Sequence, residues 1–113
     1  MTKALLESDR DQAALAARLK ALLQGVFGDR LQGVVLYGSE VRREATPESD
    51  IDLLVLLTGP IALGQDLWTC LDALYPLQLD LDRPIHALPV DAHLYAKGEY
   101  ALYRNARREG VHV

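Results

Sequence analysis

Apolar positions along the chain recur with two periods, one typical of helices and one typical of buried strands. Between residues 9 and 25 they return every three or four positions, which predicts an amphipathic helix closed by Gly25 and Gly28. The apolar positions of this helix are Leu15, Leu19, Leu22, Leu23 and Val26. Two short apolar runs, 34–37 and 51–57, predict strands. The second run is apolar on both faces, as expected of a central strand covered from both sides.

Predicted helices and strands continue to alternate in the second half of the chain. Residues 62–75 follow a helical period, and the predicted helix ends before Pro76 because proline removes a backbone donor and clashes with the preceding turn. A strand is expected between Asp82 and Leu88. Asp91 should then cap a turn or a helix, and a last, basic helix is expected over residues 100–108.

With a short helix over residues 40–44, the predicted order is helix, strand, helix, strand, helix, strand, helix. That order favours the α/β (α+β) class, with a small sheet packed against helices. The 113 residues are enough for one hydrophobic core, so a single domain over residues 1–113 is expected.

Charge and composition exclude several classes of function. The formal net charge of −4 has the wrong sign for gripping a phosphate backbone over a broad face, so nucleic acid is not expected as a partner. The longest apolar run, 53–57, is far shorter than the roughly 20 residues that cross a bilayer, and the charged N-terminal stretch does not resemble a signal peptide. The single cysteine, Cys70, fits a reducing compartment, and we therefore expect the cytoplasm.

The first candidate for chemistry is the Gly38-Ser39 pair, which ends the first predicted strand. Glycine allows a sharp turn and lets an anion approach a backbone that has no Cβ. Ser39 adds a hydroxyl next to the unpaired N–H groups at the start of a helix, and Arg42 lies one helical turn further on. These residues predict a site for phosphate groups.

Ten residues after Ser39, Asp50 and Asp52 open the second predicted strand. Side chains two apart on a strand point to the same side, so the two carboxylates should lie together. Such a pair repels unless a cation stands between its members, and oxygen ligands suit Mg²⁺ or Mn²⁺. A phosphate site beside a metal site is typical of enzymes that transfer phosphoryl or nucleotidyl groups.

The motif Gly38-Ser39, ten residues, Asp50-x-Asp52, with Arg42 inside the spacer and Leu53-Leu54-Val55 after it, closely resembles that of the minimal nucleotidyltransferases of the DNA polymerase β-like superfamily. Many of these proteins are antitoxins paired with a HEPN-domain toxin. The resemblance covers most of the chain. It implies a mixed sheet, two Mg²⁺ ions with Mn²⁺ as an alternative, and a nucleoside triphosphate, with ATP expected.

The same resemblance implies a reaction and a set of residues. A nucleoside monophosphate, AMP from ATP, would pass to a hydroxyl of a partner protein, a HEPN toxin, with release of pyrophosphate. Gly38, Ser39 and Arg42 would hold the triphosphate, and Asp50 and Asp52 the metal ions.

The chain departs from the family pattern at two points. Arg43 follows the motif arginine where family members often carry glycine. The third carboxylate of the family lies on the later strand, and counting back five residues from Asp91 gives His86. On a regular strand Asp82 would share the face of His86, with Asp80 two residues earlier. We favour Asp82 as the third catalytic and metal-binding residue, although Asp80, or no carboxylate at all, stays possible.

Two other functions remain open. The chain could be a non-catalytic module that neutralises a partner by direct contact, because the third carboxylate is in doubt. Transfer to a small molecule fits less well, since family members of that kind carry an extra helical domain. The acceptor, the base preference and the oligomeric state do not follow from the sequence. Trp68, on an uncertain face of its helix, is a further candidate for contacting a partner.

Overall fold

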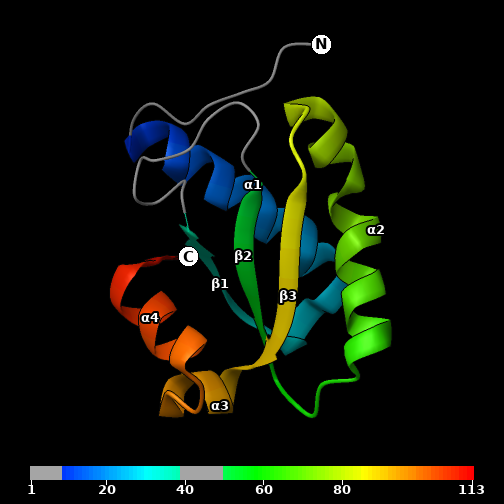
Figure 1. Cartoon of the computed structure of the whole chain (residues 1–113). Helices are drawn as coiled ribbons and strands as arrows, with labels where there is room; N and C mark the ends of the chain where they lie inside the picture. Colours follow the sequence, from blue (N-terminus) through cyan, green and yellow to red (C-terminus); the bar gives the residue numbers. More distant parts are fainter. Residues whose placement is uncertain (1–8, 39–49) are drawn as a thin grey trace.

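A computed structural model describes residues 9–38 and 50–113 and contains a four-stranded mixed sheet (Figure 1). The strand order is β3-β2-β1-β4, with bounds Leu31–Tyr37 for β1, Ile51–Leu57 for β2, Ile85–Asp91 for β3 and Val111–His112 for β4. β2 is antiparallel to β1 and parallel to β3, and β4 is antiparallel to β1. The expected α/β class with a mixed sheet is confirmed.

Helices cover both faces of this sheet. α1 (Asp9–Phe27) and α2 (Leu63–Leu81) pack on one face, while α3 (Ala92–Lys97) and α4 (Ala101–Glu109) lie on the other (Figure 1). A 3₁₀ turn, η1 (Gly28–Arg30), leads from α1 into β1. α2 is the crossover between the parallel strands β2 and β3, as parallel pairing requires.

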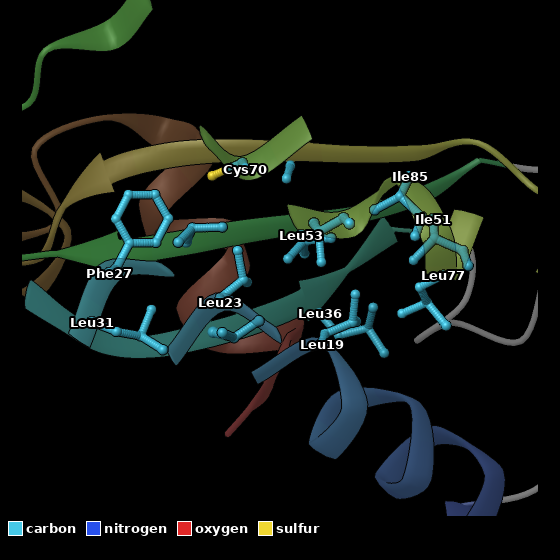
Figure 2. Packing of buried hydrophobic residues seen from close by; sticks show 14 of the residues in the cluster. Leu19, Leu23, Phe27, Leu31, Leu36, Ile51, Leu53, Cys70, Leu77 and Ile85 are labelled. Carbon is cyan, nitrogen blue, oxygen red and sulfur yellow. The ribbon is translucent and has the colours of Figure 1, made fainter. Parts of the chain in front are cut away.

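The larger part of the core lies between the sheet and α1 and α2. Leucines of α1, such as Leu19 and Leu23, meet Leu36 and Leu53 of the sheet (Figure 2). Residues of β2 alternate between this cluster and a smaller one under α4, which contains Leu54 and is closed by residues of α3 and α4. Each fully buried leucine contributes about 2 kcal/mol of transfer free energy. A shift of one residue would move these leucines to the other face of the sheet, so their burial fixes the strand register.

Several sequence predictions are confirmed. The central strand spans residues 51–57, and Asp91 caps α3 by accepting hydrogen bonds from the backbone N–H groups of His93 and Leu94. The last helix spans Ala101–Glu109 and is followed by Gly110. The first helix continues through Gly25 to Phe27, so Val26 is 48% exposed and Phe27 takes the buried place. The short strand β4 was not predicted from the sequence.

The prediction for α2 and β3 is wrong at their junction. α2 continues through Pro76 to Leu81, because buried Leu74 and Leu77 on either side of the proline hold the helix against the core. Asp82 is then the C-cap of α2, with a left-handed φ of 53°, and β3 begins only at Ile85. The alternation of leucines after Pro76 therefore belongs to a helix.

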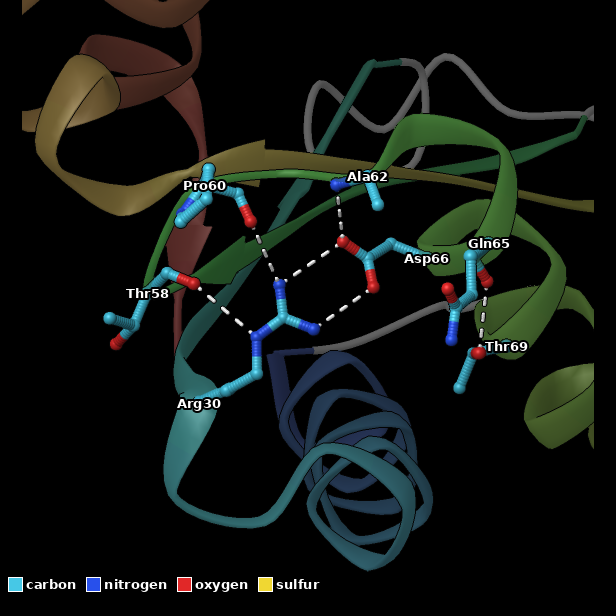
Figure 3. Close-up of polar contacts among 7 residues, drawn as sticks. All are labelled: Arg30, Thr58, Pro60, Ala62, Gln65, Asp66 and Thr69. Atoms are coloured by element: carbon cyan, nitrogen blue, oxygen red, sulfur yellow. Dashed lines mark hydrogen bonds and ion pairs between the residues drawn. The ribbon is translucent and has the colours of Figure 1, made fainter.

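An ion pair fixes the start of α2 to the start of β1 (Figure 3). Nη1 and Nη2 of Arg30 donate to the two carboxylate oxygens of Asp66 over 3.0 and 3.1 Å. Arg30 also donates to the carbonyl oxygens of Thr58 and Pro60, and Asp66 accepts from the backbone N–H of Ala62. The Asp66 side chain is 6% exposed. This pair stabilises the turn between β2 and α2.

No helix in residues 9–38 and 50–113 combines the length and the apolar character needed to span a membrane.

Candidate active site

The end of β1 and the start of β2 lie beside each other because the two strands are antiparallel. Tyr37 is opposite Asp52 in this pairing, and on the other side of β2 Asp52 is opposite His86 of β3. The three side chains therefore belong to one row across the sheet. Asp50 precedes Asp52 by two residues, at the entrance of β2. The predicted carboxylate pair is thus placed at the edge of the sheet where β1 ends.

His86 contacts the first of these carboxylates. Its Nε2 lies 3.2 Å from Oδ2 of Asp50, and the His86 and Asp50 side chains are 62% and 40% exposed. A contact this open to water is worth little for stability. It places the imidazole of β3 next to the first position of the carboxylate pair.

Gly38 has the backbone conformation expected of the turn after β1. Its φ is +81°, in the left-handed region that other residues rarely adopt. A Cβ at this position would lie 2.8 Å from Oδ2 of Asp52. Glycine therefore leaves the space that the Asp52 carboxylate occupies, a reason for glycine at this position that the sequence did not reveal.

Tyr37 lies on the same face of the sheet as Asp52, the face that α3 and α4 cover. Burial raises the pKa of its phenol, and the negative charge of Asp52 raises this pKa further. Tyr37 and Gly38 line a cavity of about 230 Å³. Its other lining residues come from α4 and are Leu102, Asn105, Ala106 and Glu109. The candidate site therefore opens toward α4.

The donor chemistry of this edge fits a divalent cation in part. Asp50 and Asp52 offer hard carboxylate oxygens, and Mg²⁺ is commonly bound by one or two protein carboxylates together with waters and substrate phosphates. Within the described parts of the chain, no group of three or more His, Cys, Asp or Glu side chains is arranged to hold a metal ion. Asp50 and Asp52 can therefore supply two carboxylate ligands to such a cation.

The structure separates the remaining candidates. Asp82 caps α2 and lines another cavity, together with Gln78 and Leu79, so it is not on the strand face expected for a third carboxylate. Asp80 forms an ion pair with Arg18 of α1 at 3.2 Å. Asp82 was preferred because the strand was expected to start there. Since β3 starts three residues later, His86 faces Asp52 instead.

Two other predicted site residues, Ser39 and Arg42, lie outside the described residues, as does the short helix expected over residues 40–44. Their proposed contact with phosphate groups stays a prediction. The signal for His86 was present in the sequence as the count of five residues back from the Asp91 cap.

A family model described as polymerase beta, nucleotidyltransferase, matches residues 18–112. No curated protein matches the chain.

Two crystal structures of toxin–antitoxin proteins have a similar fold. One is a mutant form of the toxin–antitoxin MntA-HpeT, with a TM-score of 0.61, 18% identity, and coverage of 86% of this chain and 70% of that chain. The other is a toxin–antitoxin with AMP-PNP, with a TM-score of 0.60, 19% identity, and coverage of 84% and 69%. At these identities the likeness concerns the fold.

Proposed function

The chain belongs to the polymerase β nucleotidyltransferase family, and from this membership we propose that it transfers AMP from ATP to a hydroxyl group of a partner protein. The observation that carries the proposal is the placement of Asp50 and Asp52 beside Gly38, where the ends of β1 and β2 meet.

In the proposed reaction the acceptor hydroxyl oxygen forms a bond to the α-phosphorus of ATP. The bond between that phosphorus and the oxygen bridging to the β-phosphate breaks, and pyrophosphate leaves with the bonding electrons. The hydroxyl proton passes to water. Gly38, Ser39 and Arg42 hold the triphosphate through backbone N–H groups, a hydroxyl and a guanidinium.

Asp50 and Asp52 are the proposed ligands of Mg²⁺, with two ions expected from the family resemblance. Bound ions would neutralise charge on the phosphates and activate the attacking hydroxyl, and the carboxylates of Asp50 and Asp52 would hold them. His86 is the proposed neighbour of this site on β3, since its Nε2 lies 3.2 Å from Oδ2 of Asp50 and it pairs in register with Asp52.

A toxin is the proposed acceptor protein. Both similar structures are toxin–antitoxin structures, and one was crystallised with AMP-PNP, an analogue of ATP. The HEPN identity of the toxin rests on the sequence resemblance. The cytoplasm is the proposed compartment, since the single cysteine, Cys70, cannot form an internal disulfide and fits a reducing environment.

Label transfer tests this proposal directly. The chain is incubated with Mg²⁺, ATP labelled at the α-phosphate, and the product of the adjacent reading frame as the candidate toxin, and the labelled protein is separated by electrophoresis. The double variant Asp50→Asn, Asp52→Asn should lose the label. Asp29→Asn, which removes an exposed carboxylate from η1, is the matched control and should keep it. Undiminished labelling by the double variant refutes the assignment.

The second candidate function is neutralisation of the partner by contact alone. It is favoured by the two-carboxylate site, which has no third acidic ligand in residues 9–38 and 50–113. A contact-only antitoxin should suppress its toxin equally well in EDTA without nucleotide, whereas a transferase needs Mg²⁺ and ATP.

A further inference from the structure

α2 carries two apolar stripes, and the core accounts for only one of them. The inner stripe, which includes Cys70, Leu74 and Leu77, is buried against the sheet and α1. The other, which we call the outer stripe, consists of Trp68, Leu71, Tyr75 and Leu79, with exposed fractions of 72%, 41%, 55% and 49%. A helix that is apolar on opposite sides is normally covered on both.

The outer stripe forms a continuous surface. Its residues are spaced by three or four positions, so they lie on one face of the helix. Trp68, Leu71 and Tyr75 line a cavity of about 310 Å³ together with Asp72 and Gln78. α2 lies at the border of the molecule in Figure 1, with the sheet and α1 on its inner side.

The charge on α2 is of one sign. Residues 63–81 include three aspartates and no lysine or arginine. Asp66 is bound by Arg30, and Asp80 is paired with Arg18. Asp72 is exposed, lines the cavity of the outer stripe, and forms no ion pair with any residue in the described part of the chain. An apolar surface with an unpaired carboxylate complements a partner surface that is apolar and cationic.

The outer stripe is also connected to the candidate active site. Oε1 of Gln78, which lines the cavity, accepts a hydrogen bond of 2.9 Å from the backbone N–H of Ile85. Ile85 directly precedes His86 and pairs with Ile51 of β2. The C-terminal end of α2 and the start of β3 lie at the same end of the sheet (Figure 1). A protein bound along the stripe would reach the edge that holds Asp50.

We propose that the outer stripe is the docking surface for a helix of the partner protein whose contact face carries leucine-like side chains and lysine or arginine. Trp68 and Tyr75 are the aromatic anchors, and Asp72 pairs with the cationic side chain. The identity of this partner as the acceptor rests on the proposed function, whereas the binding chemistry of the stripe does not.

Trp68 supplies the assay because it is the only tryptophan of the chain. The probe is a synthetic amphipathic helix of leucine and lysine, about 18 residues long, or five turns. Its binding should shift the Trp68 emission to shorter wavelength and reduce acrylamide quenching by at least about twofold, since the side chain leaves water. A matched peptide of leucine and glutamate should produce neither change.

Variants of the full chain locate the binding surface. Asp72→Lys and Tyr75→Ala should each raise the Kd of the leucine–lysine peptide at least tenfold, or about 1.4 kcal/mol. The controls Asp29→Lys and Val26→Ala change an exposed carboxylate and an exposed valine elsewhere and should leave the Kd unchanged. Equal binding of both peptides, or no response to Asp72→Lys and Tyr75→Ala, overturns the proposal.

Two further measurements separate this proposal from self-association of the chain and from the proposed transfer activity. Light scattering of the chain alone tests a second copy as the occupant: a dimer that Tyr75→Ala dissolves overturns the partner-helix proposal. The double variant Asp50→Asn, Asp52→Asn should bind the peptide as tightly as the unmodified chain. A chain that binds through the stripe but labels no acceptor therefore loses the proposed function and keeps the docking surface.

Discussion

The two ends of β2 carry carboxylates in opposite circumstances. Beyond the C-terminal end, both oxygens of Asp66 accept hydrogen bonds from Arg30, and one of them also accepts from Ala62 (Figure 3). At the N-terminal end, Asp50 is 40% exposed, and within residues 9–38 and 50–113 its ion-pair partner is His86 of the adjacent strand, itself 62% exposed. One end is closed by its own hydrogen bonds, and the other presents carboxylate oxygens to solvent.

This difference separates a structural carboxylate from one available for chemistry. The hydrogen bonds from Arg30 lower the pKa of Asp66, against the opposing effect of burial, so that carboxylate stays ionised and fully occupied. Asp50 is 40% exposed, so a cation or a water molecule can reach its carboxylate. In the described part of the chain, no guanidinium encloses Asp50 as Arg30 encloses Asp66. This difference indicates which carboxylate is available for chemistry more clearly than the spacing of the two acids does.

The largest expected effect comes from a substitution at the N-terminal end of β2, which should affect transfer and not stability. Asp50→Asn should lower nucleotidyl transfer about a thousandfold, or roughly 4 kcal/mol of barrier, because a metal ligand is lost. The free energy of unfolding should stay within about 0.5 kcal/mol, since the side chain is exposed. Transfer rates and urea denaturation measure the two quantities. If Asp50→Asn lowers the free energy of unfolding but leaves the transfer rate of the folded protein unchanged, Asp50 has a structural role and the proposed catalytic role is wrong.

The complementary substitution removes the charge of Asp66, beyond the C-terminal end of β2, and should affect stability and not transfer. Asp66→Asn should lower the free energy of unfolding by about 2 kcal/mol, because Arg30 and the N–H of Ala62 lose an ionised acceptor in a site that excludes most water. This figure allows for the 40% exposure of the Arg30 side chain. Transfer per folded molecule should be unchanged. Urea denaturation provides the check, and an unaltered midpoint and slope would contradict it.

Two glycines provide a sharper comparison. Gly28 and Gly38 both have positive φ, but a Cβ on Gly28 meets nothing within 4 Å, whereas one on Gly38 meets Asp52. Alanine at either position should cost about 1 kcal/mol of stability through backbone strain. Only Gly38→Ala should also reduce transfer, by at least about tenfold, since it displaces the Asp52 carboxylate. Equal transfer by both variants would contradict the proposed role of Asp52.

The smallest effect is the acid dependence of stability. The pKa of Asp66 is lower in the folded than in the unfolded chain, so its contribution is present above the unfolded pKa, about 3.9, and is lost as the pH falls through the folded pKa. The difference in unfolding free energy between the unmodified chain and Asp66→Asn should therefore shrink below about pH 4. A difference that stays constant from pH 6 to pH 3 would show that the ion pair contributes nothing.

The sequence predicted the elements with strong local signals. The apolar strand β2 and the Asp91 cap of α3 were predicted at their observed places, because burial on both faces and N-capping depend on nearby residues. The junction of α2 and β3 was not, because Pro76 is a local signal against helix that burial of Leu74 and Leu77 outweighs.

The candidate site divides in the same way. The motif placed Gly38, Asp50 and Asp52 together, and strand pairing brings the ends of β1 and β2 to one edge. The third position could not be assigned from the sequence, because a register shift of a few residues decides whether Asp82 or His86 faces Asp52.

The sequence by itself determined the spacing of glycine and aspartates along the chain, and with it the family and the kind of chemistry to expect. Only the tertiary structure decided which carboxylate is enclosed by Arg30 and which imidazole stands next to Asp52. It also decided that Trp68 and Tyr75 face solvent although their helix is apolar. The reason is physical: local patterns fix the period and the faces of an element, whereas partners across the sheet depend on register and packing between segments distant in sequence.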